Sequence, residues 1–149
     1  MTLVELMVAV AIIAIVLGVG VPSFATWVRN SQIRTATESI KNGLQLAQAE
    51  ALRRNTSVRF QLTSSVDNTC ALSTTAANWI VNRGDSASND PSGSCGAAPS
   101  DTDAPYIVQS RSANEGGGNN VAVAASQSTV VFNGLGQAVN LAGGSAAIN

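Results

Sequence analysis

The sequence predicts an α+β fold, in which one long N-terminal helix packs on a small antiparallel β-sheet. Two observations indicate this fold class. Residues 1–54 carry helical periodicity, first as a continuous apolar run and then as an apolar stripe. Residues 55–149 instead contain short runs of alternating polar and apolar side chains, separated by loops rich in Gly, Ser, Asn and Asp. At 149 residues there is room for one ordinary domain.

The first 28 residues are the most apolar part of the chain. Residues 6–21 contain no charge, and Glu5 is the only charged side chain before Arg29. At about 1.5 Å per residue, a helix over residues 6–28 is long enough to cross a hydrocarbon core of about 30 Å. No basic residue precedes the run, as one would in a secretory signal. We therefore expect residues 1–28 to be a transmembrane segment of a chain whose leader has already been removed.

Two features of this segment are costly in a simple membrane helix. A Glu5 carboxylate among apolar side chains needs a cation, and the α-amino group of Met1 on a neighbouring subunit is the nearest candidate. The alternative is a glutamate near the helix end that reaches back to water. Gly18, Gly20 and Pro22 weaken the helix, because glycine is flexible and proline lacks an amide donor. We expect this weak point to stretch or unwind on assembly.

Residues 29–54 continue the helix as an amphipathic half. Its apolar stripe recurs at spacings of three to five, through Val28, Ile33, Ala36, Ile40, Leu44, Ala47 and Ala51. Arg34 and Glu38 form an i,i+4 pair on the other side, and Arg53 and Arg54 suit the helix C-terminus. We expect the stripe to pack on the β-rich region 55–149, so that residues 29–149 form one head outside the cytoplasm.

Six short strands are predicted in the head. They cover residues 57–63, 78–82, 105–110, 120–125, 128–133 and 137–141. The intervening loops at 84–104 and 113–119 are expected to be irregular, the second of them flexible. Cys70 and Cys95 lie beyond the apolar segment, and an even cysteine count in an exported chain favours a disulfide over two buried thiols. Such a bond would stabilise the head by about 3–4 kcal/mol.

The opening MTLVELMVAVAIIAIVLGVGVPSF resembles the N-terminus of type IV pilins and type II secretion pseudopilins. This resemblance implies a pilin fold, cleavage by a prepilin peptidase and methylation of the new N-terminus at Met1, where the family usually has Phe. It also implies that Glu5 is the buried glutamate of the family and that Pro22 is its helix-kinking proline.

The head is similar to FimT/FimU-type minor pilins and to the H-type (GspH) pseudopilins. The similar stretches are LQLAQAEALRRNTSVRF at 44–60, Asn78 with Trp79, and TVVFNGLGQA at 129–138. Some FimT-type subunits resemble DNA-uptake proteins and are expected to carry a basic Gly-Arg-x-Arg motif near the last strands. The corresponding residues 134–137 read GLGQ, and only Arg83 and Arg111 are cationic beyond Arg59. Specific nucleic-acid binding is therefore not expected.

Composition also argues against a catalytic or metal-binding function. The chain has no histidine, and Gly-x-Ser-x-Gly and phosphate-loop patterns are missing, so we expect neither catalysis nor a cofactor. The aspartates at 85, 90, 101 and 103 fit no calcium loop, so no metal site is expected. The serine-rich loop offers candidates for O-linked glycosylation, namely Ser86, Ser88, Ser92 and Ser94.

We interpret the chain as a structural subunit of a type IV pilus-like filament for adhesion, motility or DNA uptake. It would polymerise through its hydrophobic helix with identical or related pilins, helped by the pilus assembly machinery. Before assembly it would reside in the bacterial inner membrane, and afterwards in an extracellular pilus. The alternative is a minor pilin or type II secretion pseudopilin, which primes assembly at the filament tip and belongs to a periplasmic pseudopilus. The head sequence favours this alternative.

Overall fold

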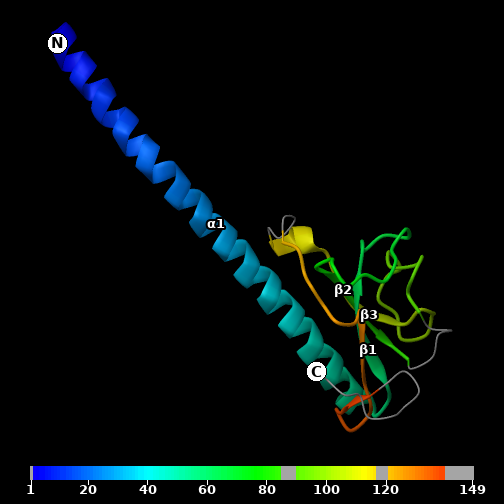
Figure 1. Ribbon diagram of the computed structural model, residues 1–149. Helices are drawn as coiled ribbons and strands as arrows, with labels where there is room; N and C mark the ends of the chain where they lie inside the picture. Colours follow the sequence, from blue (N-terminus) through cyan, green and yellow to red (C-terminus); the bar gives the residue numbers. More distant parts are fainter. Residues whose placement is uncertain (1, 85–89, 117–120, 140–149) are drawn as a thin grey trace.

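A computed structural model describes the backbone of residues 2–84, 90–116 and 121–139, with their side chains except those of residues 19–23. The elements follow one another as α1 (Leu3–Arg54), β1 (Val58–Thr63), β2 (Asn78–Arg83), β3 (Ile107–Arg111), the 3₁₀ helix η2 (Ala113–Gly116), β4 (Thr129–Phe132) and β5 (Ala138–Val139). The C-terminal part of α1 lies against the sheet, and its N-terminal part projects away from the head (Figure 1). The predicted α+β class is confirmed.

The helix α1 is one continuous element of 52 residues. It passes Gly18, Gly20 and Pro22 without a break in helical backbone. It ends at Asn55, which adopts the left-handed conformation with φ 48° and donates its amide to the carbonyls of Ala51 and Leu52. A left-handed residue of this kind, glycine or asparagine, commonly terminates helices.

The sheet is antiparallel throughout, in the order β3-β2-β1-β4-β5. The strand β1 is central, and all six of its residues are buried. Because side chains alternate along a strand, Val58, Phe60 and Leu62 share the face turned to α1, and the residues between them face the opposite way. The central strand is therefore covered on both faces.

Small residues of α1 form its contact with the sheet. Gly43, Ala47 and Ala51 are buried there. A Cβ atom at Gly43 would lie 2.7 Å from Cε2 of Phe60 and 3.0 Å from Cδ2 of Trp79, so only glycine permits this close approach. The Trp79 indole nitrogen also donates to Oγ of Ser39 at 2.9 Å, which fixes the ring against the helix.

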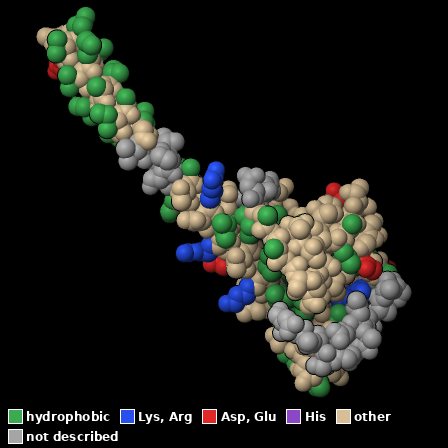
Figure 2. All heavy atoms as spheres, viewed as in Figure 1, with side chains coloured by type: hydrophobic (Ala, Val, Ile, Leu, Met, Phe, Trp, Pro, Cys, Tyr) green, Lys and Arg blue, Asp and Glu red, His purple; other side chains and the backbone are tan. Residues whose placement is uncertain are grey.

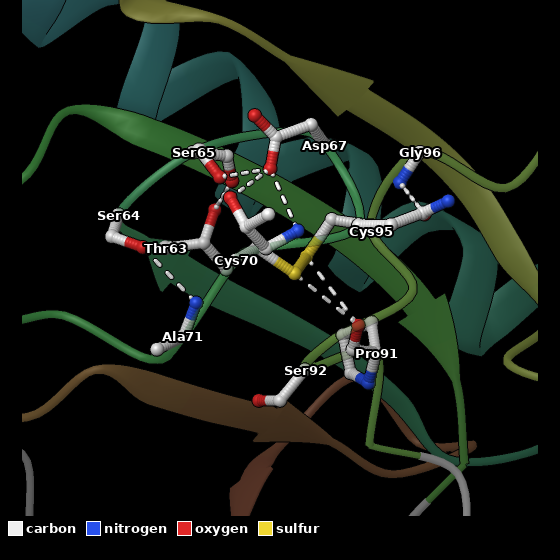
Figure 3. The surroundings of a disulfide bond; sticks show 12 residues. Thr63, Ser64, Ser65, Asp67, Cys70, Ala71, Pro91, Ser92, Cys95 and Gly96 are labelled. Carbon is white, nitrogen blue, oxygen red and sulfur yellow. Dashed lines mark hydrogen bonds between the residues drawn. A yellow bond between two sulfur atoms is a disulfide. The ribbon is translucent and has the colours of Figure 1, made fainter.

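The predicted disulfide is present on the other face of the sheet. Cys70 and Cys95 are joined there and pack with Ile80 and Ile107. Figure 3 shows the bond between the loop that carries Asp67 and the loop that carries Pro91. The disulfide thus closes the two long connections of the head over the buried strand β2.

One predicted strand is wrong, and one predicted loop begins with regular structure. Residues 121–125 are not a strand. Their backbone bonds to a loop, with Val123 N donating to the Thr75 carbonyl and Ala125 N to that of Thr74. The loop expected to be flexible begins with η2, because the Oδ1 atom of Asn78 accepts from the amide of Ala113 at 2.9 Å. The remainder of that loop, residues 117–120, lies outside the described residues.

The predicted stripe and the predicted ion pair of α1 also need correction. Ile33 is 53% exposed, because the buried contact of α1 with the sheet begins only near Gly43. Arg34 and Glu38 do not form an ion pair, although both are described. Arg preceding Glu by four residues is the weaker orientation of such a pair on a helix.

Candidate assembly surface

Among the described residues, the most extensive exposed apolar surface lies on residues 3–17 of α1, which we call the apolar tip. Its large side chains are between 54% and 76% exposed: Leu3, Val4, Leu6, Met7, Val8, Val10, Ile12, Ile13, Ile15, Val16 and Leu17. Figure 2 shows hydrophobic side chains distributed over this end of the helix. Because successive residues turn by about 100°, they surround the axis instead of forming one stripe. A helix that is apolar all round needs lipid or other helices to cover it.

A second exposed group follows one turn beyond the predicted weak point. Phe24 and Trp27 are each 65% exposed, and their rings stack with centroids 5.9 Å apart. Around Gly18 there is open space, and Gly20 and Pro22 lie in the stretch whose side chains are not described. The unwinding of this stretch on assembly therefore stays a prediction. In the described part of the chain, no helix has the length and apolar character needed to cross a membrane.

Glu5 has a local role at the start of α1. The Thr2 hydroxyl accepts from the amide of Glu5, and the Glu5 carboxylate accepts from the amide of Thr2, each at 3.4 Å. This reciprocal arrangement is a capping box. The Thr-x-x-Glu spacing of residues 2–5 is its sequence signal, although no capping box was predicted. Met1 lies outside the described residues, so its pairing with Glu5 of a neighbour stays a prediction.

The Phe-Asn-Gly-Leu-Gly stretch of the head has a structural role. The Asn133 side chain accepts from the amides of Leu135 and Gln137, both at 3.0 Å, and so forms the turn between β4 and β5. Gln48 of α1 donates to the Gly136 carbonyl at 2.9 Å. A Cβ atom on Gly134 would lie 2.7 Å from Oδ1 of Asn55, so the turn packs tightly on the end of α1.

An ion network fixes the same end of α1 to the loop before β3. Glu50 accepts from Arg53 at 2.7 Å and from Arg54 at 2.6 Å, and Arg54 also contacts Asp101 at 2.5 Å. The hydrogen bonds from Arg53, and then from Arg54, hold the pKa of Glu50 below its ordinary value against the opposing effect of burial. Sequence reasoning placed the two arginines at the helix end but had no signal for Asp101.

The serine candidates lie in the loop before β3, of which the structure describes a part. Ser92 and Ser94 are exposed, and the Ser92 hydroxyl donates to Asp90 at 2.7 Å, whereas Ser86 and Ser88 lie outside the described residues. Among the described side chains no group of three or more His, Cys, Asp or Glu is placed to hold a metal ion.

The two arginines beyond Arg59 lie in different surroundings. The guanidinium of Arg83 lies 4.6 Å from the centre of the Tyr106 ring, and Arg111 pairs with Glu115 at 3.8 Å. Each therefore has a local neighbour.

The arrangement of a long helix on a five-stranded antiparallel sheet, with a glycine turn bound to the helix end, can be compared with known families. A family model described as type II transport protein GspH matches residues 36–148. The chain belongs to the GspH family. The match confirms the predicted pilin and pseudopilin superfamily, the pilin fold and the H-type head. Neither the curated proteins nor the solved structures include a match to this GspH-family chain.

Proposed function

We propose that this GspH-family chain is a minor pseudopilin of a type II secretion system, which enters a periplasmic pseudopilus through the apolar tip. The observation that carries the proposal is the contrast between the tip and the head. Eleven large apolar side chains are exposed around one end of α1, whereas the central strand of the head is buried on both faces. The family match supports the pseudopilin alternative over our first interpretation, a subunit of a pilus for adhesion or motility.

The energetics favour a covered tip. Burying a large aliphatic side chain contributes about 1.5–3 kcal/mol, so ten such side chains contribute about 15–30 kcal/mol before the cost of association. In the inner membrane, lipid would cover them before assembly. In the pseudopilus, the helices of neighbouring subunits would take the place of lipid. The prepilin peptidase and the assembly machinery are the further partners that this route requires.

Glu5 provides the sharpest test, because two roles can be separated at this residue. Glutamine can also complete a capping box but carries no charge. If the carboxylate pairs with the α-amine of Met1 on a neighbour, Glu5→Gln and Glu5→Ala should both abolish incorporation and leave membrane retention intact. If Glu5 only caps α1, Glu5→Gln should assemble normally and only Glu5→Ala should fail.

The measurement is the amount of this chain in sheared filaments and in the membrane fraction of the same cells. Thr2→Ser is the matched control, because serine also caps helices and the carboxylate is retained. Normal assembly of Glu5→Ala would overturn both roles. Mass spectrometry of the sheared filaments separates the two functional classes. Trace amounts of the chain, with loss of secretion in its absence, support a minor pseudopilin, whereas a dominant amount would support a major pilus subunit.

A further inference from the structure

The stretch of α1 between the apolar tip and the head carries aromatic and cationic side chains together. Trp27, Asn30, Ser31 and Arg34 line one hollow on the helix surface, and Phe24 stacks on Trp27. We call these five residues the aromatic–arginine belt. Trp27 and Arg34 are seven residues apart, or nearly two turns, so they lie on the same side of the helix. Neither the capping box nor the packing of the head involves this belt.

The belt itself contains no acidic residue. Arg29 and Arg34 are the charged residues between Leu6 and Thr37, and Glu38, one turn beyond Arg34, forms no ion pair with it. Both arginines are exposed. A guanidinium presents a planar set of donors that fits a phosphate, and tryptophan prefers surroundings that are apolar at one end and wet at the other. Asn30 and Ser31 add neutral hydrogen-bonding groups to the same hollow.

The length of α1 determines how far the belt lies from Glu5 across the membrane. Trp27 follows Glu5 by 22 residues of continuous helix, which corresponds to about 33 Å. This span matches a hydrocarbon core of about 30 Å, so the charge of Glu5 and the indole of Trp27 would lie at opposite boundaries. Ser39, whose hydroxyl accepts from Trp79 of β2, lies about 18 Å beyond Trp27 along the helix. This contact with the head therefore lies on the side of the belt away from the apolar tip.

We propose that the aromatic–arginine belt binds the headgroup layer of a bilayer that contains anionic phospholipid. Arg34 contacts the lipid phosphate, Asn30 and Ser31 donate to headgroup oxygens, and Trp27 lies at the level of the glycerol backbone. The charge of the belt and its continuity with the apolar tip both favour lipid as the occupant. This inference rests on the proposed function, because it assumes that the subunit resides in a membrane before assembly.

Tryptophan quenching tests the site in the full chain. The protein is reconstituted in phosphatidylcholine bilayers that contain either brominated phosphatidylglycerol or brominated phosphatidylcholine. The emission of Trp27 is obtained by subtracting the Trp27→Phe protein, because the other tryptophan, Trp79, is buried in the head and stays in both samples. The ratio of quenching by the anionic and the neutral lipid measures anion selectivity at the belt.

One cation near a membrane surface corresponds to about a fivefold preference for anionic lipid. We expect a ratio of at least this size for the wild-type protein, because Arg29 is a second exposed cation of the same stretch, and a clearly lower ratio in Arg34→Gln. Arg111→Gln is the matched control, because it removes the same charge from β3 in the head, and its ratio should equal that of the wild type. A wild-type ratio of one would overturn the proposal.

Two further outcomes distinguish failure of the lipid site from failure of membrane residence. If the protein is retained in the bilayer but neither lipid quenches Trp27, another subunit covers the belt, and the lipid site is wrong while membrane residence stands. If the protein is not retained in the bilayer at all, the proposed function fails with it.

Discussion

The two parts of α1 carry different kinds of side chain, although they belong to one helix. Where α1 packs on the sheet, its buried residues are small: Gly43, Ala47 and Ala51. In the apolar tip the side chains are large and exposed on every side of the helix. Small residues allow a sheet to approach closely, whereas large residues on all sides require partners from outside the chain. The side-chain size along α1 thus distinguishes an intramolecular contact from an intermolecular one.

If the apolar tip does not depend on the head, destabilising the head alone should leave the helix of the tip intact. Replacing both Cys70 and Cys95 with serine should lower the free energy of unfolding by about 3–4 kcal/mol, because the loop that the bond closes spans a sequence separation of 25. The apolar tip makes no contact with this bond, so its helix should persist in detergent. Urea unfolding followed by Trp79 fluorescence reports the head, and circular dichroism reports the helix.

Reduction provides the control for this prediction. A reductant should lower the stability of the wild-type head to that of the double variant and leave the double variant unchanged. Complete loss of helicity together with loss of the head would contradict the independence of the two parts of α1.

The next test adds the same single carbon to each part of the helix. Gly43→Ala should destabilise the head by about 1–2 kcal/mol. Overpacking against Phe60 and Trp79 costs about 1–3 kcal/mol, and the better helix propensity of alanine offsets part of that cost. Gly18→Ala is the matched control, because an added Cβ meets open space there and the head should unfold as in the wild type. If Gly43→Ala instead stabilised the head, the contact of α1 with Phe60 and Trp79 would have room for a methyl group.

The features of the fold that could be predicted from the sequence are those with a local signal. The helix, five of the six strands and the pairing of the two cysteines were predictable, because periodicity and cysteine number are local properties of the chain. Residues 121–125 alternate as a strand does, and Val123 and Ala125 pack on the core, but their amides bond to a loop. Whether a segment finds a neighbouring strand to pair with depends on the tertiary arrangement. The contact of Arg54 with Asp101 joins residues 47 positions apart and had no local signal. In the apolar tip the structure adds the capping box, which was predictable from Thr2 and Glu5 and was missed.

The smallest expected effect concerns the end of α1 that carries the ion network. The pKa of Glu50 is lowered by hydrogen bonds from Arg53 and Arg54, so the folded head binds this proton less readily than the unfolded chain. The stabilisation is therefore present above the ordinary glutamate pKa of about 4.3 and is lost as pH falls through the lower pKa of the folded state. Glu50→Gln should cost about 0.5–1 kcal/mol near pH 7, because the network is partly exposed.

The matched variant for this prediction is Glu38→Gln, which removes the same charge from α1 at a residue that makes no ion pair with the described part of the chain. Thermal unfolding of the three proteins between pH 7 and pH 3 is the measurement. The gap between wild type and Glu50→Gln should close as the pH falls, and Glu38→Gln should unfold close to the wild type at pH 7. A gap of constant size would mean that Glu50 supports the helix end through packing. In that case, charge would contribute nothing to the attachment of the loop before β3.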